Sequence, residues 1–263
     1  MRILSILTAG VFAAGIASAA NAGSILIVNG AGATPEASTT ASITTQISQL
    51  EIAVGNTVTI VDTTPLSLAG YQQVWDIRFS NASPIDTALR GEYLSYLQSG
   101  GGIFAMGENA NFGTRNDSVI ALIGAAGGGA LTYVVPGDAQ TVIAPFTGPN
   151  AVSTIEYAAA GGTTTSGTGQ FITSNANGGS GVAFGVGTLA NAPKGTLTAI
   201  FDVNFLQTDA PSDSQQLTKN LIGFIGNQVG PGVPEPATWA MMLTGFGLVG
   251  VAARRRKSSY TTA

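Results

Sequence analysis

The 263-residue chain contains neither cysteine nor histidine. Without cysteine it forms no disulfide and offers no thiol nucleophile. Without histidine it cannot build a Ser-His-Asp or Cys-His catalytic group, and histidine-based acid–base catalysis is excluded. The two absences together remove the usual zinc ligand sets. The sequence therefore indicates no metal, no cofactor and no catalytic residue, and any enzyme activity would have to rely on other groups, such as carboxylates.

Charged residues are scarce as well, at 9% of the chain. Between Gly23 and Val233 there are five basic and thirteen acidic residues, which gives this segment a net charge of −8. An acidic domain with scattered lysines and arginines repels polyanions. We therefore expect no nucleic-acid partner.

Residues 1–22 have the organisation of a secretory signal peptide. Arg2 precedes an apolar run over residues 3–16, and small residues follow directly. Ala20-Asn21-Ala22 forms an Ala-x-Ala site that predicts cleavage before Gly23, and Ala17-Ser18-Ala19 is a competing site. The secretion machinery and signal peptidase are thus the first expected partners.

The carboxy-terminal part combines a proline motif, an apolar segment and a basic cluster. Residues 230–236 form a linker that ends in Pro234-Glu235-Pro236, and the apolar segment 237–253 follows with Trp239 near its start. This segment has 17 residues, the short limit for a membrane-spanning helix. Its far end meets a basic cluster that would hold residues 254–263 in the cytoplasm by the positive-inside rule. The arginines of this cluster are Arg254, Arg255 and Arg256.

This order of features resembles the PEP-CTERM sorting signal of Gram-negative bacteria that make extracellular polysaccharide. The same segment is also described as an ice-binding protein C-terminal motif, a name that says nothing about the rest of the chain. The resemblance rests on Pro234-Glu235-Pro236, Trp239-Ala240-Met241-Met242, Gly245-Phe246-Gly247 and the arginine run. It implies an inner-membrane intermediate, processing by an exosortase, and then release or anchoring at the cell surface. An ordinary single-span anchor with a chance Pro-Glu-Pro is the alternative.

Residues 23–229 alternate expected strands and helices. Such alternation predicts an α/β, doubly wound, mostly parallel sheet of the flavodoxin-like type, with right-handed crossovers. Residues 124–181, rich in Gly and Thr, predict an inserted region of short strands and long loops. Strands are expected at 24–29, 57–61, 74–79, 103–106, 182–186 and 197–204, and helices after Thr34-Pro35-Glu36, at 87–98 and at 212–228.

One stretch of this domain resembles the class I glutamine-amidotransferase-like superfamily. The pattern is Tyr71 followed by Val74-Trp75-Asp76-Ile77, and then Tyr96 before Gly100-Gly101-Gly102-Ile103-Phe104. The resemblance implies the fold only. Amidotransferase chemistry requires a cysteine and a histidine, and this chain has neither.

The best candidate ligand site follows the expected fourth strand, because ligands of open α/β sheets bind beyond the carboxyl ends of the strands. In the resembled superfamily a functional side chain lies near the position of Glu108. Carboxylates and amides in this region suit a sugar or an oxygen-liganded cation. Alternatively, these side chains cap backbone groups and the arginine pairs with an acid. The candidates are Glu108, Asn109, Asn111, Arg115 and Asp117, with Asp202 from a later strand end.

Three functions remain open on the sequence alone. The first is a non-catalytic, exported cell-surface or matrix protein with extracellular polysaccharide as a candidate partner. The second is a divergent hydrolase or carbohydrate-active enzyme, which needs two carboxylates about 5–9.5 Å apart in an open cleft. The third is a polysaccharide- or ice-binding module with a flat, threonine-rich face. Burial of the acids in backbone caps would count against the second.

Overall fold

A computed structural model describes residues 22–30 and 37–229. The expected signal peptide except its last residue, the helix cap at 34–36 and everything from residue 230 onward lie outside the described residues. The predicted membrane-spanning segment 237–253 and the sorting motif are therefore not among them. Within the described ranges, no helix has both the length and the apolar character needed to cross a membrane.

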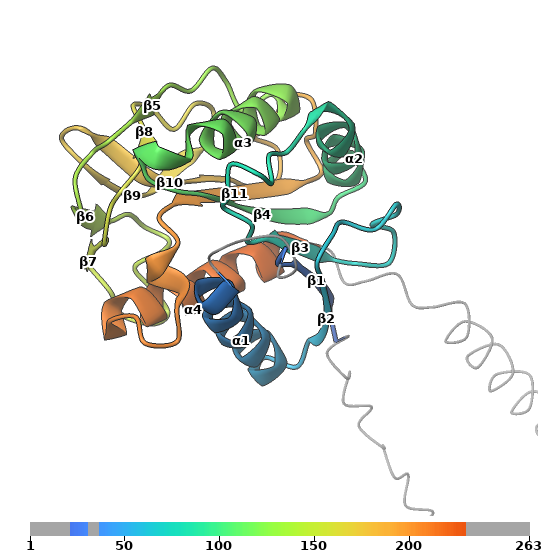
Figure 1. Ribbon diagram of the computed structural model, residues 1–263, viewed down its shortest axis with the longest axis horizontal. Helices are drawn as coiled ribbons and strands as arrows, with labels where there is room; N and C mark the ends of the chain where they lie inside the picture. Colours follow the sequence, from blue (N-terminus) through green and yellow to red (C-terminus); the bar gives the residue numbers. More distant parts are fainter. Residues whose placement is uncertain (1–21, 31–36, 230–263) are drawn as a thin grey trace, which may run out of the picture.

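One half of the main sheet is parallel, as predicted. Its strand order is β2-β1-β3-β4-β11, and each neighbouring pair runs in the same direction (Figure 1). All of these strands except the edge strand β2 are buried along nearly their whole length, as is typical of parallel sheets. They span Ser24–Val28 (β1), Thr57–Val61 (β2), Gln73–Asp76 (β3), Gly102–Gly107 (β4) and Thr196–Phe201 (β11).

The other half of the sheet is antiparallel, so the prediction of a mostly parallel sheet is wrong for this part. Beyond β11 the order continues β10-β9-β6-β7, with every pair antiparallel. Loops rather than helices connect these strands, and parallel pairing requires a long crossover. The Gly/Thr-rich region thus extends the same sheet instead of forming a separate layer. The strands are Gly178–Phe184 (β10), Gln170–Asn175 (β9), Ala139–Val142 (β6) and Thr154–Glu156 (β7), with a side ribbon of Tyr133–Val134 (β5) and Gly162–Thr163 (β8).

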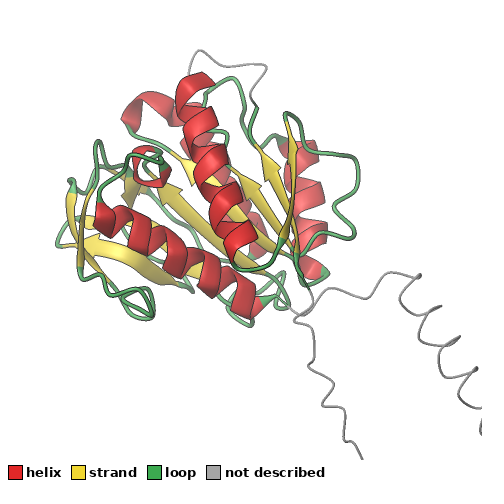
Figure 2. Cartoon of the chain, turned by 90° about the horizontal axis from the view of Figure 1, so that it is seen from below, coloured by secondary structure: helices red, strands yellow, loops and turns green. Residues whose placement is uncertain are grey.

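Helices cover both faces of the sheet (Figures 1 and 2). The first, Ala37–Ala53 (α1), and the last, Ser212–Gln228 (α4), pack on one face. The second, Thr87–Gln98 (α2), and the third, Gly113–Ala126 (α3), pack on the other. Two short 3-10 helices, Ala110–Phe112 and Asn204–Leu206, follow β4 and β11.

The core is divided by the sheet into two apolar clusters because alternate strand residues point to opposite faces. Ile25 and Ile27 of β1 face α1 and α4, whereas Leu26 and Val28 face α2 and α3. Trp75 of β3 stacks on Phe104 of β4 with ring centroids 4.6 Å apart, on the α1 side.

The strand order fixes where functional groups can gather. The strand order reverses at β1, because β2 lies on one side of it and β3 and β4 lie on the other. In open α/β sheets, ligands bind beyond the carboxyl ends of the strands at such a reversal, which is called the topological switch point. The carboxyl ends of β3, β4 and β11 then bring Asp76, Glu108 and Asp202 to one edge. The described domain begins and ends at the opposite, amino edge: Gly23 precedes β1, and Val229 lies beside Gly102 at the start of β4.

Candidate functional site

Glu108 follows β4 directly, and its carboxylate connects the ends of two strands. The backbone N–H of Val203, just beyond β11, donates to Oε2 at 2.6 Å, and Nδ2 of Asn109 donates to Oε1 at 2.7 Å. Asn116 of α3 bonds both backbone groups of Glu108: the Glu108 N–H donates to its Oδ1, and its Nδ2 donates to the Glu108 carbonyl, each at 2.8 Å. The Glu108 side chain is 2% exposed. Both of its oxygens therefore serve local structure.

Asp202 plays the same part at the end of β11. Its Oδ2 accepts the backbone N–H groups of Ala158 at 2.8 Å and Ala159 at 3.0 Å, and its Oδ1 accepts that of Asn204 at 2.7 Å. The residue is fully buried. Asp202 thus holds the loop after β7 against the end of β11.

Burial governs the acidity of this pair. Desolvation raises the pKa of Glu108 to about 7, and the negative charge of Asp202 adds to the increase, while hydrogen bonds from Val203 and Asn109 oppose it. Desolvation also raises the pKa of Asp202, against the hydrogen bonds from Ala159, Asn204 and Ala158. Each carboxyl is thus harder to ionise than it would be in water.

Asp76, the last residue of β3, lies between two guanidinium groups. Arg78 binds it in a bidentate manner, with Nε 2.8 Å from Oδ1 and Nη2 2.7 Å from Oδ2. Nη2 of Arg115 lies 3.3 Å from Oδ1, and the hydroxyl of Tyr93 donates to Oδ2 at 3.0 Å. The side chains of Asp76 and Arg115 are both fully buried. Burial alone would raise the pKa of Asp76, but the charges of Arg115 and Arg78 hold it at about 2.

Arg115 also serves the backbone. Its Nε donates to the Met106 carbonyl at 2.8 Å, and its Nη1 donates to the Ser83 carbonyl at 2.9 Å. The first is in β4 and the second is in the loop before α2. Arg115 therefore joins two segments that the sequence separates, and it is not available to an external ligand.

The remaining predicted site residues point elsewhere. Asn109 caps the 3-10 helix by accepting the Asn111 N–H at 3.0 Å, and Asn111 itself is exposed. Asp117 is exposed on α3. Asn116 and Asp117 could have been expected to cap the helix after β4, but both lie inside α3, whose N-cap residue is Phe112. The structure therefore brings Glu108, Asn109 and Asp202 together, but it does not gather the six candidates around one open cavity.

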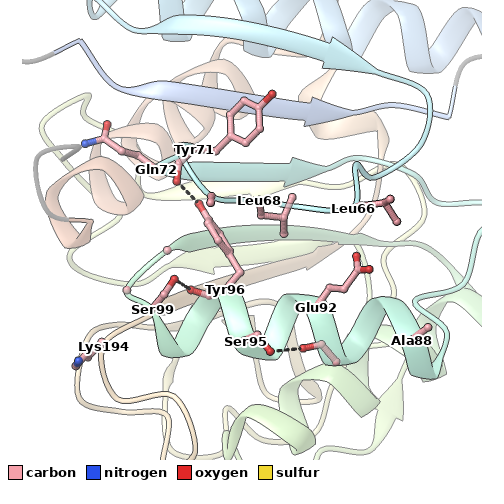
Figure 3. A pocket seen from close by; sticks show the side chains of 15 residues that line it. Leu66, Leu68, Tyr71, Gln72, Ala88, Glu92, Ser95, Tyr96, Ser99 and Lys194 are labelled. Carbon is pink, nitrogen blue, oxygen red and sulfur yellow. Dashed lines mark hydrogen bonds between the residues drawn. The ribbon is translucent and has the colours of Figure 1, made fainter. Parts of the chain in front are cut away.

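A groove of about 1010 Å³ lies at a different place, between α2 and the segment 66–72 that leads into β3 (Figure 3). Small residues form much of its lining, namely Ala69, Gly70, Ala88, Gly91, Gly100 and Gly101. The hydroxyls of Ser95 and Ser99 donate to the carbonyls of Gly91 and Tyr96. The polar residues of the lining are Tyr71, Gln72, Glu92, Ser95, Ser99 and Lys194. The Tyr96 hydroxyl donates to the Tyr71 carbonyl at 3.1 Å and closes the base between the two walls.

The lining of this groove is chemically mixed. It combines aromatic, hydroxyl and amide groups with one acid and one base, and its small residues leave room for a broad ligand. In the sequence, Tyr71 and Gly100–Gly102 were part of a pattern that predicted the fold, and they were not predicted to line a binding site. No sequence signal links Lys194 to α2, because the two meet only through the pairing of β4 with β11.

Replacing Asp76 by Asn tests the buried charge cluster. The substitution leaves the two guanidinium groups without a counter-charge, and breaking such a buried pair costs about 3–5 kcal/mol. We expect urea denaturation of the domain to show a loss of this size in the free energy of unfolding. The matched control, Asp117→Asn, removes an exposed acid and should stay within about 0.5 kcal/mol of the parent. Equal effects of the two variants would contradict the assignment.

The Glu108 pKa predicts a pH dependence of stability. Its rise from 4.5 to about 7 means that the folded state holds the proton more tightly than the unfolded chain does. The stabilisation that protonated Glu108 gives to the folded state is therefore fully present below pH 4.5 and is lost as the pH rises through about 7. In Glu108→Gln, the decrease in unfolding free energy over this window should be smaller by up to about 3 kcal/mol. Urea titrations from low to neutral pH measure it, and an unchanged decrease would argue against a buried carboxyl.

Comparison with a family model identifies the carboxy-terminal segment. The PEP-CTERM protein-sorting motif matches residues 232–257, as predicted from the tail. This motif implies secretion with a membrane-anchored sorting intermediate, exosortase processing, and then the cell surface or extracellular space. No curated protein matches the chain significantly.

Solved structures similar to the domain show its fold alone, since their identities to it are low. The mmIFT52 N-terminal domain aligns with a TM-score of 0.57 at 10% identity, covering 77% of this chain and 96% of that domain. A ThuA-like protein from Bacteroides uniformis aligns with a TM-score of 0.51 at 14% identity, covering 85% and 98%. The exo-beta-1,4-mannosidase Op5Man5 from an Opitutaceae bacterium gives 0.50 at 11% identity, with 77% of this chain matching 35% of the enzyme.

These comparisons refine the fold assignment. The ThuA-like fold is related to the amidotransferase-like fold, whereas the closer amidotransferase assignment is not confirmed. The chain thus carries an α/β domain similar in fold to a ThuA-like protein, and its residues 232–257 match the PEP-CTERM protein-sorting motif.

Proposed function

We propose that this protein is a non-catalytic component of the cell surface or extracellular matrix, delivered by the exosortase pathway, that binds extracellular polysaccharide. One observation carries the proposal. The acids at the carboxyl edge of the sheet, where a catalytic site would be expected, are occupied by backbone N–H groups and arginines. The acidic residues at the ends of these strands therefore stabilise the fold.

The geometry of Glu108 and Asp202 weighs against the hydrolase alternative. A glycosidase needs two carboxyl groups that face the substrate across a cleft. Here the side chain of Glu108 is 2% exposed, that of Asp202 is fully buried, and each accepts at least two hydrogen bonds. A substrate could reach them only after these contacts were broken.

The groove beside α2 supports a binding role. Its polar groups come from elements on both walls, and Gln72 and Gly101 place it towards the amino edge of β3 and β4. The described chain also ends at that edge, with Val229 beside Gly102. The groove therefore lies on the side of the domain where the described chain ends, just before the residues that lead to the sorting motif.

A groove-filling variant tests this function. Gly91 and Ser95 are exposed on one face of α2, and a Cβ at Gly91 meets nothing within 4 Å. Leucine is a good helix former, so Gly91→Leu/Ser95→Leu should fold while filling the groove. We expect retention of the exported protein on immobilised exopolysaccharide from a Gram-negative producer to fall about tenfold or more.

The matched control carries the same change on α3. Gly113 and Asp117 have the same spacing and are exposed, and Gly113 is equally open. Gly113→Leu/Asp117→Leu should bind like the parent protein. Retention of the α2 variant at the parent level, or absence of retention in the parent itself, would refute the proposed function.

A further inference from the structure

The edge strand β2 is open to pairing. It is the first strand in the sheet order, and among the strands of residues 22–30 and 37–229 it pairs only with β1. All five of its residues, Thr57 to Val61, are β-branched, and three of them are exposed. Uncharged β-branched edges of this kind are templates for pairing with another strand, and proteins normally protect them with charges, prolines or short length.

Within residues 37–61, from the start of α1 to the end of β2, the structure shows no exposed charge, and the exposed Asp62 lies just beyond the end of β2. From α1 to the end of β2, residues 37–61, the only ionisable residue is Glu51, and its side chain is fully buried. Instead, Ile52, Val54 and Ile60 are 58%, 64% and 48% exposed. A surface helix ordinarily bears charges on its outer face. Depletion of charge together with exposed apolar side chains is characteristic of the centre of a protein interface.

The opposite edge strand makes the contrast clear. The strand β7 has only three residues and contains the exposed Glu156. A short, charged strand is a protected edge. The two ends of the same sheet are therefore built differently, and only the β2 end is suited to continue the sheet.

The distribution of charge on the domain indicates which partner pairs with β2. The segment from Gly23 to Val233 carries −8, so two copies repel each other over most of their surfaces. The face formed by residues 37–61 adds none of that repulsion, and a cationic partner would find only Asp62, beyond the end of β2, to pair with there. We infer that two copies of this chain associate through β2, antiparallel and two-fold symmetric, to form one continuous sheet across a dimer.

The register of such a pair follows from the β1–β2 hydrogen bonds. Thr57 donates to Gly23, and Asn29 donates to Val61, so odd-numbered residues of β2 bond inward to β1. Val58 and Ile60 then direct their backbone groups outward. A two-fold axis at Thr59 pairs Val58 of each copy with Ile60 of the other and leaves Thr59 opposite itself in a non-hydrogen-bonded pair, with Cα atoms about 4.5 Å apart. This distance lies within the range of disulfides.

Cysteine cross-linking tests the pairing directly, because the chain has no cysteine of its own. Thr59→Cys, exported into an oxidising compartment, should migrate as a reducible covalent dimer on a non-reducing gel. The matched control is Thr154→Cys, which places an exposed cysteine on the other edge strand, β7. It should remain monomeric under the same conditions.

A second variant tests the association without a cross-link. Ile60→Lys adds a charge to each copy at the interface, and because Ile60 is half-exposed, the fold of each subunit should persist. Sedimentation of the exported chain should show a dimer whose association weakens about tenfold or more in this variant, with an unchanged circular dichroism spectrum. A monomeric parent protein, or Thr59→Cys that cross-links no more than Thr154→Cys, would overturn the inference. Neither result depends on polysaccharide binding.

Discussion

Asp76 is held between Arg78 and Arg115 at the carboxyl end of β3, and most of this edge of the sheet is arranged around that contact. Arg115 reaches from α3 across the end of β4 to the Met106 carbonyl and to the Ser83 carbonyl before α2. One buried carboxylate thereby positions a strand end, a helix and a loop. The cluster is stable only as a whole, because a buried charge without its partner costs several kcal/mol.

The consequence for function is that the usual ligand-binding edge of an α/β sheet is occupied by internal contacts. Asn116 pairs with the backbone of Glu108, and Glu108 and Asp202 satisfy the loops that follow β4 and β11. Our two proposals therefore place recognition on other surfaces: the groove between α2 and residues 66–72, and the face of residues 37–61 at β2. This division suits an exported protein that binds and assembles rather than one that turns over a substrate.

Local signals predicted most elements of the parallel half, but α3 was not expected from the sequence, and the strands expected at 74–79 and 197–204 end earlier, at Asp76 and Phe201. The strand at 57–61 and the helices at 87–98 and 212–228 have the predicted limits, since their periodicity and end residues are local, as when Asp86 caps α2 through the Leu89 N–H. The antiparallel half depends on distant pairings such as Thr141 with Ser174, which short strands do not encode. The positions of Glu108 and Asp202 after strand ends correctly predicted that the two residues lie near each other. The direction of each carboxylate, however, is set by the N–H groups of Val203 and Ala158, which the fold brings from other parts of the chain.

The claim that these acids serve structure and not chemistry is tested most directly by the chain length of bound polysaccharide. Exopolysaccharide incubated with the purified exported protein is analysed over time by size-exclusion chromatography with light scattering. Our account predicts that the polymer is retained by the protein and keeps its full length. Progressive shortening by the parent protein, abolished in Glu108→Gln or Asp202→Asn, would contradict it.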